Sequence, residues 1–174
     1  MKLVFALAIV LVLAGTAHGG SPDRSLLQKA SAFSSLVGDE PCLSENGAAF
    51  LRLLHREAVD EFMQLAKAGR PAGQLYALCG LEALRAPQAA VLRKRLSKMA
   101  VRTTLHYGCV PQTEEVRTFF RKLPDGTPAQ FDQICQSLTG IQESSKVVMC
   151  GERREQPGTS FTGVRGHHLH ESER

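Results

Sequence analysis

The sequence predicts a mainly α-helical protein: a single α-rich domain of about six helices with a small two-stranded β element near its C-terminal end. Apolar residues recur at intervals of three and four over most of residues 22–140, the spacing of a helix with one buried face. Beyond Met99 the interval changes to two, which indicates a strand. Five cysteines further predict that disulfides cross-link the domain.

Residues 1–19 are predicted to form a cleavable secretory signal peptide. A lysine follows Met1, the run Leu3–Ala14 is apolar throughout, and mainly small residues follow it up to Gly20. The apolar run is shorter than the about 20 residues that a membrane-spanning helix needs, so we expect no transmembrane segment in the mature chain. The mature protein should therefore be secreted or periplasmic, with its first residue between His18 and Ser21.

Two amphipathic helices are predicted in the first part of the mature chain. The first begins at Pro22, with Ser21 as its N-cap, and ends at Gly38. The second runs from about Ala48 to Gly69, and its apolar residues recur at helical spacing along the whole length.

The next two predicted helices supply the centre of the fold. Residues Ala72–Arg85 are apolar around most of the helix circumference, so this helix should be the best buried. Within it, Gly80 indicates a close crossing with another helix. Pro87 begins a further helix whose apolar face includes Leu96 and extends to Met99.

Strand and helix alternate in the rest of the domain. Residues Val101–Cys109 alternate apolar and polar side chains, which predicts a half-buried strand. Thr113 is expected to cap a short helix, and the Thr-x-x-Gln pattern beginning at Thr127 predicts a capping box for a last helix that ends at Gly140. The β-prone run Lys146–Cys150 is expected to pair with the first strand.

Residues 152–174 are predicted to form a disordered tail, which leaves residues 20–151 as the globular domain. Large apolar side chains nearly vanish after Glu152, so little burial is available to offset the entropy of ordering this segment. His167, His168 and His170 offer imidazoles to a metal ion, and one interpretation of the tail is metal handling. A flexible terminus lacks fixed ligand geometry, so we expect neither a metal site nor a cofactor.

The charge pattern predicts a mostly solvated surface. The whole chain carries a formal net charge of +4, and acidic and basic residues are interleaved along most of it. In the densest basic run, helical spacing would place Lys94, Lys98 and Arg102 on one side of a helix. We interpret this run as a solvated face, with an anionic lipid head group or polysaccharide as an alternative partner. Nucleic acid is not expected, because no stacking aromatic side chains lie among these charges.

Cysteine pairing is left open by the sequence. No Cys-x-x-Cys motif is present, which argues against a thioredoxin-type site and against a zinc ribbon. Cys79 is the expected free thiol because its helix is the most apolar. The preferred disulfide joins Cys109 to Cys150, since each ends a β-prone run, and Cys135 is the rival partner for either. The disulfide candidates are Cys42, Cys109, Cys135 and Cys150.

No catalytic motif emerges from the sequence. The run Gly158–Gly163 has the spacing Gly-x-Ser-x-x-Gly, whereas a nucleophile elbow needs Gly-x-Ser-x-Gly. Arginine is twice as frequent as lysine and asparagine occurs once, usage that indicates a bacterial protein. We therefore expect a non-enzymatic binding or structural component of the periplasm or envelope, whose partner is an unknown protein or an envelope component. The alternative is a small secreted hydrolase or redox enzyme, for which His55, Cys79 and His106 would have to lie within hydrogen-bonding reach.

Overall fold

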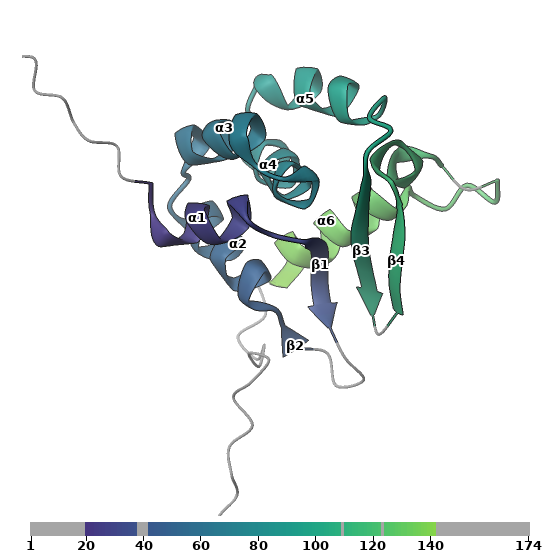
Figure 1. The fold of residues 1–174 in the computed structure, drawn as a ribbon, viewed down its shortest axis with the longest axis horizontal. Helices are drawn as coiled ribbons and strands as arrows, with labels where there is room; N and C mark the ends of the chain where they lie inside the picture. The colour runs from purple at the N-terminus through teal and green to yellow at the C-terminus, as the bar shows by residue number, and fades with distance from the viewer. Residues whose placement is uncertain (1–19, 38–41, 109, 123, 142–174) are drawn as a thin grey trace, which may run out of the picture.

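Six α-helices and a four-stranded sheet form the part of the chain that the computed structural model describes, residues 20–37, 42–108, 110–122 and 124–141 (Figure 1). The expected number of helices is therefore confirmed within these residues. The elements follow in the order α1 (Pro22–Gln28), β1 (Ala32–Val37), β2 (Cys42–Leu43), α2 (Glu45–His55), α3 (Val59–Ala68), α4 (Pro71–Ala83), α5 (Gln88–Leu96), β3 (Arg102–Gly108), β4 (Val110–Glu115), a 3₁₀ helix (Val116–Phe120) and α6 (Gln130–Gly140).

The sheet is larger than the two-stranded element that the sequence predicts. Its strand order is β2-β1-β3-β4. The central strands β1 and β3 are parallel, with Ala32 opposite Thr104, and each edge strand is antiparallel to its neighbour. The predicted strand after Met99 is confirmed as β3, but within the described residues its partners are β1 and β4. The β-prone run at residues 146–150 lies outside the described residues.

The first predicted helix is wrong beyond Gln28. Helix α1 begins at Pro22 as expected, but strand β1 replaces the second half of the predicted helix. Three serines between residues 31 and 35 favour non-helical backbone, because their side chains compete for local hydrogen bonds. In the strand, Phe33 packs edge-on against Tyr76 and stacks on Phe131, with centroid distances of 4.8 and 5.7 Å. Pairing with β3 and these buried ring contacts outweigh the helical spacing.

The long second helix is also wrong, because the chain breaks it into α2 and α3. Glu57 takes a left-handed φ of 52° between the two helices. Its N–H donates to the Leu54 carbonyl at 2.9 Å, and the N–H of Ala58 donates to the Leu53 carbonyl at 3.1 Å. These two bonds form a Schellman motif, which ends α2. Glycine usually occupies the left-handed position, so a glutamate there gives no signal in the sequence.

The predicted caps near the C-terminal end do not form. Thr113 lies in β4, where its hydroxyl is 2.9 Å from the hydroxyl of Thr104 on β3. Helix α6 begins at Gln130 without a side-chain cap. The Gln130 side chain donates to Gln112 Oε1 on β4 at 3.0 Å, instead of completing the capping box predicted from Thr127. A contact between distant elements thus replaces the local one.

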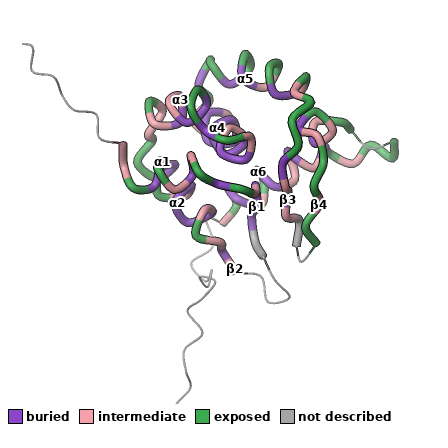
Figure 2. The backbone as a smooth tube through the Cα atoms, in the orientation of Figure 1, coloured by how far each residue is buried: buried purple, intermediate pink, exposed green. Residues whose placement is uncertain are grey.

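Helix α4 lies at the centre of the fold, as its apolar circumference predicts. It contacts the five other α-helices as well as β1 and β3, and Figure 2 shows it buried along most of its length. Gly80 lies against Phe62 of α3, so close that an added Cβ would be 2.4 Å from the Phe62 Cζ atom. Gly80 therefore marks the close helix crossing that the sequence indicates.

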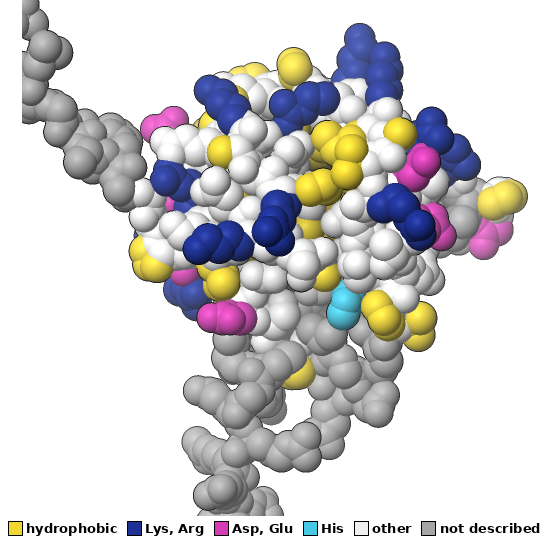
Figure 3. All heavy atoms as spheres, viewed as in Figure 1, with side chains coloured by type: hydrophobic (Ala, Val, Ile, Leu, Met, Phe, Trp, Pro, Cys, Tyr) yellow, Lys and Arg dark blue, Asp and Glu magenta, His cyan; other side chains and the backbone are white. Residues whose placement is uncertain are grey.

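Figure 3 shows one face of the molecule, on which charged and apolar side chains are interleaved. Lysine and arginine side chains are prominent along the upper part, where α5 lies, and apolar groups are visible between them. None of the described helices combines the length and the apolar character that a membrane span requires.

Candidate functional site

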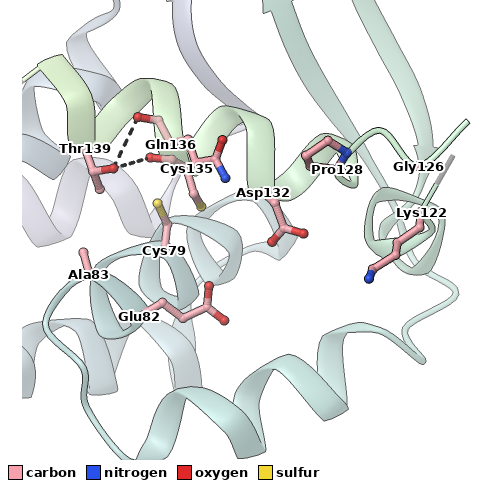
Figure 4. A pocket seen from close by; sticks show the side chains of 10 residues that line it. All are labelled: Cys79, Glu82, Ala83, Lys122, Gly126, Pro128, Asp132, Cys135, Gln136 and Thr139. Carbon is pink, nitrogen blue, oxygen red and sulfur yellow. Dashed lines mark hydrogen bonds between the residues drawn. The ribbon is translucent and has the colours of Figure 1, made fainter.

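A hollow of about 400 Å³ between α4 and α6 is lined by two cysteines, two carboxylates and a lysine. Cys79 and Glu82 enter it from α4, and Asp132 and Cys135 enter it from α6 (Figure 4). Lys122, on the loop before α6, lines its outer side. We call this cavity the α4–α6 hollow.

Two thiols face each other across the inner wall of the α4–α6 hollow. Cys79 is 1% exposed, and Figure 4 shows its sulfur directed toward that of Cys135. Burial raises the pKa of the Cys135 thiol well above its ordinary value, and a hydrogen bond with Cys79 raises it further. A nucleophilic cysteine needs the opposite, a lowered pKa beside a cation or a helix N-terminus. The Cys135 thiol is therefore protonated at neutral pH and has little nucleophilic character.

Arg93 of α5 binds both carboxylates of the hollow. Its guanidinium forms two hydrogen bonds to Glu82, at 2.6 and 2.8 Å, and one to Asp132 at 2.6 Å. The same group lies over the rings of Phe120 and Phe131, 5.5 and 5.0 Å from their centroids. The hydrogen bonds to Glu82 are the main cause that raises the pKa of Arg93. Both carboxylates are thus held by one permanent cation and tie α4, α5 and α6 together.

The ligand set of the hollow does not suit a metal ion. No group of three or more His, Cys, Asp or Glu side chains in the described part of the chain is placed to hold one. In the hollow, the two carboxylates are directed to Arg93 and the thiols are directed to each other.

The three residues that an assembled hydrolase site would need do not converge. His55 ends α2 and lines a second hollow of about 550 Å³ together with Glu57. Cys79 lines the α4–α6 hollow, and His106 on β3 lines neither of the two. The cysteine consequently has no histidine beside it in its hollow.

The described cysteines are distributed over three elements. Cys79 and Cys135 are free thiols, and no disulfide joins two described cysteines. Cys42, at the start of β2, is not a free thiol. Cys109 and Cys150 lie outside the described residues, as do the tail histidines and the run at residues 158–163. The predicted disulfide pairing therefore stays a prediction.

The basic run after Pro87 is divided between two elements, because α5 ends at Leu96. Lys94 is exposed on α5, Lys98 is exposed in the following turn, and Arg102 is exposed at the start of β3. Helical spacing predicts these three side chains on one face of a single helix. This prediction is wrong, because only Lys94 lies on α5. The turn at Lys98 redirects the chain into the sheet.

Sequence reasoning missed the contact of Arg93 with Glu82 and Asp132. The three residues lie on three different helices and are separated by 11 and 39 positions, so no local spacing points to them. One signal was available in the sequence: Glu82 is the single acidic residue between Phe62 and Thr113 and lies on an apolar helix. A charge that is partly buried in this way is costly unless a cation pairs with it.

Comparison with protein-family models, with curated proteins and with solved structures finds no match for this chain.

Proposed function

We propose that the chain is an exported, non-enzymatic protein that acts by binding to a component of the cell envelope. The observation that carries this proposal is that the carboxylates and thiols of the α4–α6 hollow are bound to protein groups. Its carboxylates are bound to Arg93, its thiols contact each other, and the pKa of Cys135 is raised by burial. A site organised in this way holds helices together and offers neither a general base nor an activated nucleophile.

The core supports the same interpretation. Every buried side-chain nitrogen and oxygen among the described residues has a hydrogen-bond partner. Buried polar groups left unpaired are a common mark of a catalytic or ligand site, because their pairing is completed by the substrate. With none in the described interior, a function on the outer surface is favoured.

The second candidate function is that of a redox enzyme, which the proximity of Cys79 to Cys135 favours. A thiol–disulfide exchange assay separates the two candidates. The purified mature chain is mixed with reduced glutathione and insulin, and insulin reduction is followed by turbidity. We expect the same slow rate with the wild type, with Cys79→Ser and with no protein. A faster rate that Cys79→Ser abolishes would establish the redox enzyme instead.

Export and envelope binding are tested in bacterial cells that express the full chain. Mass spectrometry of the exported fraction should find an N-terminus between His18 and Ser21. The processed chain should sediment with the envelope after gentle lysis and be released by salt if its contact is electrostatic. An intact Met1 in the exported fraction would overturn the proposal.

A further inference from the structure

The net positive charge of the chain is concentrated in its middle third. Between Phe62 and Thr113 there are eight lysines and arginines and a single acidic residue, Glu82. This acid is already bound by Arg93. The basic residues of this segment are Lys67, Arg70, Arg85, Arg93, Lys94, Arg95, Lys98 and Arg102. The overall charge of +4 therefore hides a much larger local excess of positive charge.

Four of these cations lie exposed on α5 and on the chain that leaves it. Ala89 and Leu92 face the core, which turns Lys94 to the opposite, solvent side of the helix. Arg95 donates to a carbonyl and to an amide oxygen, and Arg102, which lies opposite Glu115 in the sheet, donates to a carbonyl. The acceptors of these hydrogen bonds carry no charge. Among the ion pairs of the described residues, none involves these four side chains: Lys94, Arg95, Lys98 and Arg102.

Apolar side chains are exposed among these cations. Val91 is 74% exposed and Val101 is 52% exposed, and they are two of the three large apolar side chains that are exposed in the described part. Val91 precedes Lys94 and Arg95 by one helical turn, and Val101 stands next to Arg102. The third, Val110, begins β4 outside this cluster. Val91 and Val101 are apolar but do not contribute to the core of this chain, so core packing does not explain why valine stands at these two positions.

Exposed valines among unpaired cations fit one class of partner better than the others. At the surface of an anionic bilayer, basic side chains bind lipid phosphates while neighbouring apolar side chains enter the headgroup region. A soluble polyanion would use the cations but would gain nothing from exposed valines. The described helices include none that could span a membrane, so such contact would be peripheral.

We propose that Val91, Lys94, Arg95, Lys98, Val101 and Arg102 form a peripheral binding surface for anionic phospholipid bilayers. We call this set the α5 surface. The proposal rests on the proposed function, since it names the envelope component that an exported binding protein would contact. Each basic residue near an anionic membrane contributes about fivefold to the partition coefficient.

Vesicle co-sedimentation of the mature chain tests the proposal. The vesicles contain either phosphatidylcholine alone or phosphatidylcholine mixed with phosphatidylglycerol. We expect binding to the mixed vesicles only, with an affinity that decreases as salt is added. Lys94→Glu should weaken binding by at least about fivefold. Lys29→Glu is the matched control. It changes the net charge equally at an exposed position at the end of α1, which is outside the α5 surface, so this variant should bind as the wild type does.

A second pair of variants tests the apolar contribution. The double variant Val91→Ser, Val101→Ser should weaken vesicle binding severalfold and leave heparin binding unchanged, whereas Val110→Ser should change neither. Because all of these side chains are exposed, the variants should keep the wild-type melting temperature by circular dichroism, which shows that they fold.

The outcomes separate this inference from the proposed function. Binding to heparin without binding to mixed vesicles would overturn the membrane surface and indicate a soluble polyanion. Binding to neither, while the processed chain still sediments with the envelope in cells, would also overturn it but would leave the proposed function in place. A chain that is not exported would overturn both.

Discussion

The hydroxyl of Tyr76 on α4 is bonded to both main-chain polar groups of Ser34 on β1. It accepts from the Ser34 N–H at 3.0 Å and donates to the Ser34 carbonyl at 2.9 Å. The register of β1 against β3 shifts between Ser34 and Val37. One fully buried side chain thus satisfies backbone groups next to the irregular part of the sheet and fixes β1 against the central helix.

Replacing Tyr76 by phenylalanine should destabilise the protein by about 2 kcal/mol, because it leaves buried backbone groups of Ser34 without partners. Ser34→Ala is the matched control, since it keeps both main-chain bonds and removes only the serine hydroxyl. Urea unfolding followed by circular dichroism measures both variants. A Tyr76→Phe variant as stable as the wild type would contradict this role of the hydroxyl.

Gly80→Ala should destabilise the protein, although alanine favours helices by about 1 kcal/mol over glycine. The new Cβ would lie 2.4 Å from the Phe62 ring, which is fully buried, so the ring or a helix would have to shift. Gly140→Ala is the control, because a Cβ there meets nothing within 4 Å. We expect a lower melting temperature for the first variant and an equal or higher one for the second; the reverse order would show that the crossing of α3 and α4 is loose.

Glu57→Gly should stabilise the protein by about 1 kcal/mol, since glycine adopts the left-handed backbone between α2 and α3 without strain. Glu57→Ala serves as the control, because alanine keeps the strain and loses the same exposed carboxylate. Thermal unfolding compares the two variants. If the glycine variant proved no more stable than the alanine variant, the Schellman motif at the end of α2 would be wrong.

Stability should decrease above about pH 9. Burial raises the pKa of Cys135 above its ordinary value of 9.0 and that of Tyr76 above its ordinary value of 10.0. Between the unfolded and the folded pKa, the folded chain keeps a proton that the unfolded chain has lost, so the free energy of unfolding falls as the pH rises. Below pH 9 this contribution is fully present. Urea unfolding under reducing conditions measures the pH dependence.

Cys135→Ser should move the onset of this alkaline decrease in stability from about pH 9 toward about pH 10. The remaining decrease would then come from Tyr76, whose ordinary pKa is 10.0. An unchanged onset would assign the decrease to other groups.

Oxidation is expected to join Cys79 to Cys135, whose sulfurs face each other in the α4–α6 hollow. The two thiols would lose two protons and two electrons, and glutathione disulfide, the oxidant, would be reduced to two thiols. Closing the loop between these residues should stabilise the fold by about 4 kcal/mol if the bond is unstrained. In the structure Cys79 is a free thiol, as the sequence predicts, and the bond to Cys135 is expected only when this oxidant is added. A bond between Cys109 and Cys150 stays a separate prediction.

Peptide mapping without reduction decides the cysteine pairing. A fragment that links Cys135 to Cys109 or Cys150 would contradict the pairing with Cys79. Cys79→Ser should show no change of melting temperature on treatment with glutathione disulfide, if the stabilisation comes from this bond.

The candidate site was accessible to sequence reasoning only in part. That Cys79 lies on an apolar helix follows from its neighbours, and the basic run of α5 can be read directly from the chain. That Cys79 faces Cys135, and that Arg93 bridges Glu82 and Asp132, depends on how three helices pack, which no spacing along one helix reveals. The exposure of Val91 likewise depends on which face of α5 meets the core.

By itself, the sequence determined the helical class of this protein, the position of α4 at its centre and the strand after Met99, because each of these depends on an apolar period within one segment. Only the tertiary structure decided that the chain after Gln28 becomes a strand. Its partner Thr104 lies 72 positions from Ala32, and the pairing energy and ring burial gained there exceed the helical preference of the segment. It also decided where α2 ends, because packing holds Glu57 in a backbone conformation that its own side chain disfavours.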